Sequence, residues 1–328
     1  MHALSVITWT ALIASAFVMT AGARFARAQS VFPAKPVRML VPFSVGGQPD
    51  SVARIIAPKL ADVWKQPVVV ENRPGASGTI GFAIVANAVP DGYTLMLVSA
   101  AFTASAATQQ GLAYDPRKDF AGVAQLGVNT QVLVAASALG AKSIEDIVAL
   151  AKAKPGQLVW ATPGPGSGPY LIGERFRLDT GIKTIHVAFK GGPEIIVELL
   201  AGRSHYAFTS LGSALPFIKD GRLRPLAVAM PQRAALLPDV PTVSESLPGF
   251  HRVLGSYGVL APAQTPRTIV NQIGREIVRL VNTPEIRDPL QAIGLAPAPL
   301  AGEEYHRVLL DQIDALSSLV RSIGMRTK

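Results

Sequence analysis

The chain alternates short apolar runs with longer amphipathic stretches, and turns that contain glycine or proline separate the two. Residues 37–41 form one such run, and apolar side chains then recur at helical spacing over residues 52–63. Residues 158–162 lead in the same way into a glycine-rich loop and a helix predicted to end near Asp179. Strands that alternate with helices form parallel sheets with right-handed crossovers. The sequence therefore predicts an α/β fold, and its many strands suit two smaller lobes better than one wide sheet.

The composition excludes several other classes of protein. The 328 residues are 49% hydrophobic and 16% charged, which is incompatible with a disordered chain. The absence of cysteine excludes a disulfide scaffold, a thiolate zinc site and a cysteine nucleophile. The net charge of +9 comes from basic residues scattered singly or in pairs, so the sequence predicts no nucleic-acid partner. A diffuse positive charge instead favours the approach of anionic solutes.

The N-terminus has the features of an export signal. Residues 3–23 are apolar and uncharged, and Ala26-Arg27-Ala28 then matches the small-x-small pattern of a cleavage site. We therefore expect residues 1–28 to be a signal peptide, and the mature chain, which begins at Gln29, to lie in the periplasm. The alternative is an uncleaved anchor, because about 20 apolar residues can span a bilayer.

The sequence lacks the motifs of the common enzyme classes. It contains no G-x-S-x-G, S-x-x-K, H-E-x-x-H or phosphate-loop motif, and none of its 5 histidines is paired at metal-ligand spacing. Gly164, after a strand, resembles part of a dinucleotide-binding motif, but the next strand ends in Phe189 and Lys190, without the acidic residue that would hold a ribose. We therefore expect no catalytic residues, no metal and no cofactor.

Three loops have the composition of an anion-binding site. Residues 42–50 and 162–169 each join a strand to a helix, where glycine lets the backbone approach a ligand and the first amides lack partners. The helix dipole favours a negative group there. Thr162 and Ser167 would add hydroxyl donors, and Ser99 with Phe102, after another strand, would form a third wall. Each turn alone is also an ordinary α/β connection.

Short motifs follow one another in order along nearly all of the mature chain. They are Val41-Pro42-Phe43 with Gly46-Gly47, Asn72-Arg73-Pro74-Gly75, Pro90-Asp91-Gly92-Tyr93-Thr94, Tyr114-Asp115-Pro116 with Asp119-Phe120, Ala151-Lys152-Ala153-Lys154-Pro155-Gly156, Leu237-Pro238-Asp239-Val240-Pro241 and Leu260-Ala261-Pro262. The chain thereby resembles the tripartite tricarboxylate transporter substrate-binding proteins, known as the Bug family. The Asn-Arg-Pro-Gly and Pro-Asp-Gly-Tyr-Thr strings together make this resemblance specific.

The resemblance implies a periplasmic-binding-protein fold, with two α/β lobes, a hinge of two crossovers and a ligand cleft between the lobes. It implies a first lobe of residues 29–128 and 252–328 and a second lobe of residues 129–251. The implied function is a receptor that captures a small carboxylate, such as an organic, amino or aromatic acid. The implied partner is a transporter with two integral-membrane subunits. Such a receptor is expected to be a monomer without enzymatic activity.

The loops and the resemblance together give a set of candidate binding residues. These are Phe43, Ser44, Gly46, Gly47, Asp50, Ser99, Phe102, Thr162, Gly166, Ser167, Gly168, Tyr170, Phe189, Lys190 and Thr209. The chain departs from the common pattern of the family at Ser44, Val45, Gly168, Pro169, Tyr170, Thr209 and Ser256. An acidic residue is frequent in the family where Thr209 stands. Because most departures fall in the implied cleft, the ligand of a relative does not transfer to this chain.

Two other functions stay open at this point. A binding protein that serves a sensor kinase would have the same sequence features, and genomic neighbours would separate it from a transport receptor. An enzyme on this fold would need a clustered acid, base or nucleophile, which the sequence does not display.

Overall fold

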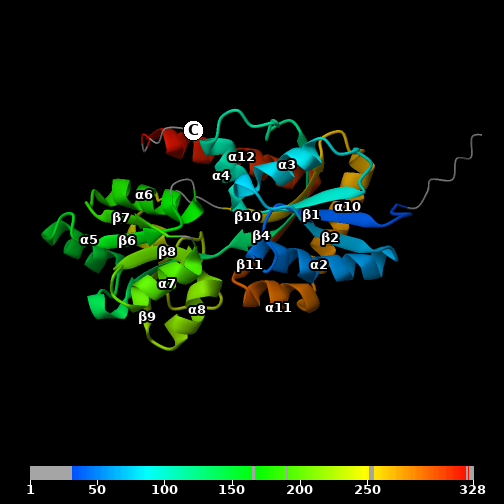
Figure 1. The fold of residues 1–328 in the computed structure, drawn as a ribbon. Coiled ribbons are helices and arrows are strands. Elements are labelled where there is room, and N and C mark those ends of the chain that lie inside the picture. Colours follow the sequence, from blue (N-terminus) through cyan, green and yellow to red (C-terminus); the bar gives the residue numbers. More distant parts are fainter. Residues whose placement is uncertain (1–31, 165–166, 190, 251–254, 323, 325–328) are drawn as a thin grey trace, which may run out of the picture.

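The computed structural model describes residues 32–164, 167–189, 191–250, 255–322 and 324. The predicted signal peptide, Gly166 and Lys190 lie outside the described residues. The chain folds into two lobes, each built on one β-sheet with helices on both sides (Figure 1). None of the helices in these ranges is both long and apolar enough to span a membrane.

The first sheet has six strands in the order β11–β4–β10–β3–β1–β2. Their bounds are β1 Val37–Val41, β2 Val68–Asn72, β3 Thr94–Val98, β4 Phe120–Asn129, β10 Ser256–Pro262 and β11 Leu295–Ala301. β1 is parallel to β2 and β3, whereas β10 is antiparallel to both β3 and β4, and β11 is antiparallel to β4. The prediction of a parallel sheet is therefore correct for β1, β2 and β3 and wrong for the rest of this sheet, because β10 enters from the second lobe and runs against the strands that point toward it.

Helices cover both faces of the first sheet. Their bounds are α2 Gln48–Trp64, α3 Thr79–Ala86, α4 Ala100–Thr108, α10 Arg267–Val281, α11 Pro284–Ala292 and α12 Gly302–Ser322. Successive side chains of a strand point to opposite faces. Met39 and Val41 accordingly pack with α2, α10 and α11, whereas Leu40 packs with α3, α4 and α12. Burial on both faces explains why these strands are continuous apolar runs in the sequence.

The second sheet has five strands in the order β7–β6–β8–β5–β9. The strands are β5 Gln131–Ala136, β6 Val159–Thr162, β7 Ile185–Ala188, β8 Tyr206–Ser210 and β9 Leu223–Val228, and the helices are α5 Ile144–Ala153, α6 Gly168–Thr180, α7 Gly192–Leu200, α8 Leu211–Lys219 and α9 Val243–Ser246. β6 is parallel to β7 and β8, but β5 is antiparallel to β8 and β9 because it carries the chain away from the first lobe. Trp160 is fully buried in the core that this sheet forms with α5, α6 and α9.

The chain passes from the first lobe to the second at Thr130, between β4 and β5, and returns ahead of β10. Thr130 is held on both sides, since its N–H donates to Gly294 O (3.2 Å) and its carbonyl accepts from Leu211 N–H (2.8 Å). A Cβ atom on Gly212 would lie 2.6 Å from Ile293 O, so only glycine allows the start of α8 to approach the first lobe this closely. The first crossover is thus packed tightly between the two lobes.

Candidate functional site

A cavity of about 370 Å³ lies between the lobes, and we call it the interlobe cleft. Gln48 and Ala100 line it from the first lobe, and Gly168, Gly192 and Thr209 line it from the second. None of the described residues that line it carries a charged side chain. Any charge preference that these described residues give the cleft therefore comes from backbone groups and neutral side chains.

Five helices direct their N-termini into the interlobe cleft. Gln48, Ala100, Gly168 and Gly192 are the first residues of α2, α4, α6 and α7, and all four line the cavity. Ser210, the N-cap residue of α8, lines it as well. A helix N-terminus carries partial positive charge and outward-pointing amides. The cleft is therefore positively polarised without a cationic side chain among its described lining residues.

The starts of α2, α7 and α8 have no side-chain cap among the described residues. The N-cap residues of α2 and α7 are Gly47 and Gly191, which have no side chain to offer. Ser210 at the start of α8 donates its hydroxyl to Asn129 Oδ1 (3.2 Å) instead. The first amide of α8, Leu211 N–H, donates to Thr130 O, but no side chain caps any of the three helices, and their starts are consequently the part of the cleft that is best suited to bind an anion.

The hydroxyls of Ser99, Thr162 and Ser167 are engaged inside the protein. Ser99 and Ser167 cap α4 and α6 by accepting N–H groups at 3.4 and 3.3 Å. Thr162 is fully buried, its Oγ1 accepts from Gly164 N–H at 3.0 Å, and it lies 2.7 Å from His186 Nε2. Thr162 and Ser167 therefore hold the second loop, Ser99 caps α4, and none of the three lines the cleft.

The aromatic candidates Phe102, Tyr170 and Phe189 are not among the residues that line the cleft. Phe102 is fully buried and packs edge to face on Phe82, because the third residue of α4 faces the sheet. Tyr170 stacks on Trp160 with ring centroids 5.8 Å apart, and Phe189 packs against the core under α7 and α8. The three rings therefore pack inside the lobes next to the candidate loops and do not face the cleft.

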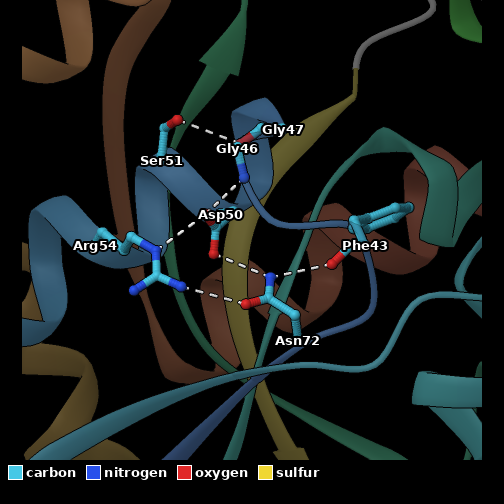
Figure 2. Close-up of polar contacts among 7 residues, drawn as sticks. All are labelled: Phe43, Gly46, Gly47, Asp50, Ser51, Arg54 and Asn72. Atoms are coloured by element: carbon cyan, nitrogen blue, oxygen red, sulfur yellow. Dashed lines mark hydrogen bonds and ion pairs between the residues drawn. The ribbon is translucent and has the colours of Figure 1, made fainter.

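Asp50 organises the first loop from within. It is buried, and its Oδ2 accepts from Gly46 N–H (2.9 Å) and Arg54 Nε (3.0 Å), while Oδ1 accepts from Asn72 Nδ2 (2.9 Å) (Figure 2). The same Asn72 amide donates to Phe43 O at 3.0 Å. One carboxylate and one amide thereby tie the loop to α2 and to the end of β2, which fixes the N-terminus of α2 in the cleft.

The remaining candidates of this loop form a turn. Ser44 O accepts from Gly47 N–H at 3.3 Å, and Gly46 has a φ of +80°, a left-handed conformation that favours glycine. Ser44 and Gly46 are exposed and do not line the cleft, whereas Gly47 is the N-cap residue of α2. The shape of the turn therefore explains Gly46, whereas Gly47 has a φ of −72°, an extended conformation that other residues also adopt.

The hydrogen bond from Arg54, together with those from Gly46 and Asn72, lowers the pKa of Asp50 to about 2. A carboxylate with a lowered pKa stabilises the folded state above its unfolded pKa, about 3.9, and this contribution is lost as the pH falls toward the folded pKa. We expect Asp50→Asn to reduce the free energy of unfolding most above about pH 5, with a difference from the wild type that shrinks between about pH 4 and 2. Urea denaturation over a pH series measures this difference, and a constant difference would contradict the assignment.

Of the candidate residues, Gly168 and Thr209 line the cleft. The sequence analysis missed a chain of hydrogen-bonded polar side chains beside them, of which Gln48, Asn129 and Ser210 also line the cleft. Gln48 Oε1 accepts from the Tyr257 hydroxyl (2.9 Å) and from Asn129 Nδ2 (3.3 Å), and Asn129 in turn accepts from Ser210. The chain links α2 of the first lobe to the start of α8 in the second. Its one sequence signal is position, because Gln48 starts a helix and Asn129 and Ser210 each end a strand.

A second cavity of about 490 Å³, which we call the rear cavity, lies on the opposite face of the crossover. Val128 and Thr130 line the rear cavity, whereas Asn129 and Gln131 line the interlobe cleft. This division follows from the alternation of side chains along an extended chain. Met230 and its neighbours close the rear cavity from the second lobe, and β11 closes it from the first.

A cleft between two α/β lobes, polarised by helix N-termini, defines a two-lobe solute-binding protein. Residues 52–325 match the model of the tripartite tricarboxylate transporter family receptor, and the chain belongs to this family. It is 32% identical over 316 residues to Protein BugT of Bordetella pertussis, an alignment that covers 95% of this chain and 96% of BugT. The family and the two-lobe fold predicted from the sequence are thus confirmed.

Two solved structures with ligands are similar to this chain. Rpa4515 of R. palustris with adipate has a TM-score of 0.78 and 28% identity, over 89% of this chain and 98% of that one. MatC of Rhodopseudomonas palustris with bound malate has a TM-score of 0.72 and 29% identity, over 88% of this chain and 100% of that one.

Proposed function

We propose that the chain is a receptor that captures a small carboxylate in the interlobe cleft and delivers it to the integral-membrane subunits of a tripartite tricarboxylate transporter. The convergence of five helix N-termini on a cavity whose described lining residues carry no charge is the observation that supports this function. A micromolar ligand requires about −8 kcal/mol, whereas one charge-assisted hydrogen bond contributes about 1.5–3 kcal/mol before other costs. Several donors must therefore act together, and the helix starts supply them.

The lining of the cleft favours a simple acid over an amino acid. No aspartate or glutamate is among the described residues that line it, so an ammonium group would have no carboxylate partner there. The similar structures with adipate and malate hold acids without an amino group. A ligand of the same kind, with carboxylate but no ammonium, fits the cleft best.

The organisation of the molecule follows from this role. By this proposal residues 1–28 direct export and are removed, and the mature protein acts in the periplasm as a monomer that performs no chemistry. Residues 29–128 and 252–328 form the first lobe and residues 129–251 the second, and the lobes close on the ligand about the two crossovers. Gly166 and Lys190, which lie outside the described residues, remain proposed binding residues.

The function is tested with protein purified from the periplasm, whose intact mass should correspond to residues 29–328. Thermal-shift screening against organic acids should find acids that raise the melting temperature, because a ligand that binds only the folded state stabilises it. Each acid is compared with its neutral amide, which has a similar shape but lacks the charge. We expect calorimetry to show binding of the acid and not of the amide. Equal binding of both, or a mass that retains residues 1–28, would contradict the corresponding part of the proposal.

A further inference from the structure

The two ends of the interlobe cleft differ in chemistry. Near the crossover the lining is polar, since Asn129, Ser210 and Thr209 lie there with the uncapped starts of α2, α7 and α8. The start of α7 adjoins the same group, because a Cβ atom on Gly192 would lie 3.5 Å from Ser213 Oγ and 3.8 Å from Thr209 Oγ1. This end gathers the hydrogen-bond donors of the cleft.

The other end is formed by α4, α6 and α12, and most of its side chains are apolar; the hydroxyl of Thr103 donates to Ala100 O within α4 (3.1 Å). Leu171 of α6 and Leu316 of α12 line the cleft and belong to one hydrophobic cluster that joins the two lobes. Leu171 is fully buried, and Ile172 and Ala104 extend the apolar wall beside it. Figure 1 shows the C-terminal end of α12 reaching over the second lobe toward α6. The starts of α4 and α6 also reach the cleft, but the side chains of Ser99 and Ser167 already cap them, and no described lining residue at this end carries a charge.

We propose that the ligand is a monocarboxylate with an apolar body, held with its carboxylate at the starts of α2, α7 and α8 and its body against Leu171, Ile172 and Leu316. This inference rests on the proposed function and adds the ligand class. A second carboxylate at the far end would lose its water against apolar side chains and helix starts that serine side chains already cap, which is unfavourable. A methyl group in the same place covers apolar surface, which is favourable.

The test compares hexanoate with adipate on the full mature chain by calorimetry. Both have six carbons, and adipate differs in carrying a second carboxylate where hexanoate has a methyl group. Benzoate with terephthalate and cyclohexanecarboxylate with cyclohexane-1,4-dicarboxylate provide rigid pairs of the same design. In each pair that binds, we expect the monocarboxylate to have the lower dissociation constant, by on the order of 100-fold.

A substitution at the apolar end adds an independent readout. Leu316→Lys places a cation beside the far end of the ligand and should reverse the preference, so that adipate binds more tightly than hexanoate. Ala315→Lys is the matched control, because Ala315 is the exposed neighbour on the same helix and does not line the cleft. The control should keep the wild-type preference. The comparison of acids on the wild type stands even if the Leu316 variant does not fold.

The outcomes separate this inference from the function on which it rests. Tighter binding of monocarboxylates supports both. Equal or tighter binding of dicarboxylates by the wild type overturns the monocarboxylate proposal and leaves the receptor function standing. Failure of every acid, including those that fit the volume of the cleft, contradicts the carboxylate receptor and the ligand class together.

Discussion

Replacing Thr209 by aspartate should lower the affinity for a carboxylate ligand by about a hundredfold or more. Thr209 is buried, lines the cleft and lies beside the uncapped starts of α7 and α8. An aspartate there would accept hydrogen bonds from the amides that the ligand needs, and it would repel the ligand's charge. Like charges in contact cost several kcal/mol, and each 1.4 kcal/mol is a tenfold change in affinity.

Thr209→Asn provides the control for this prediction. Asparagine has the size and shape of aspartate but no charge, so it should retain most of the affinity while the aspartate variant loses it. Calorimetry with the acid found for the wild type measures both, after circular dichroism has shown that each variant is folded. If the two variants bound the acid equally well, the positive polarisation of the cleft by the helix starts would not determine binding.

Gly173→Val should lower the free energy of unfolding by a large amount, through a clash inside the second lobe. A Cβ atom on Gly173 of α6 would lie 2.0 Å from Cζ3 of Trp160, which is fully buried. Neither the ring nor the helix can move without disturbing the core, and overpacking of this kind costs about 3 kcal/mol. Urea denaturation should show that loss in the free energy of unfolding.

Gly168→Ala is the matched control on the same helix. No atom lies within 4 Å of a Cβ placed on Gly168, so its stability should stay within about 0.5 kcal/mol of the wild type. Wild-type stability of the Gly173 variant would show that α6 can shift away from Trp160.

The elements whose patterns are local were predictable from the sequence. The run at residues 37–41 is the strand β1 with the same bounds, and the run at 158–162 differs from β6 by one residue. The two glycine-containing loops do lead into α2 and α6, whose starts line the cleft. In these segments one stretch of chain carries both the strand and the turn that ends it, so nothing distant is needed to recognise them.

The strands β4 and β11 were missed because their character depends on distant neighbours. β4 contains Gly122 and Gly127, which look like turn residues, yet added Cβ atoms would lie 2.7 Å from His306 N and 2.5 Å from Ala296 O. β11 contains Pro297 and lies at the edge of the sheet, where proline is tolerated. The glycines mark close packing, which a sequence pattern cannot distinguish from a turn.

The site was predictable as a set of loops and not as a set of side chains. A serine or threonine at a helix start can cap the helix or bind a ligand, and Ser99, Thr162 and Ser167 prove to have internal partners. Asn129 enters the cleft only because β4 continues into the second lobe, which is a long-range consequence of topology.

The shared wall between the interlobe cleft and the rear cavity has a consequence for hydration. Since Thr130 faces one cavity and Asn129 the other, a rotation about this crossover that narrows the cleft widens the space behind it. If the lobes close as proposed, water released in front would be matched by water admitted behind, against apolar side chains such as Met230. Wetting that surface would oppose closure, so residues that never touch the ligand would help to set how tightly it is held.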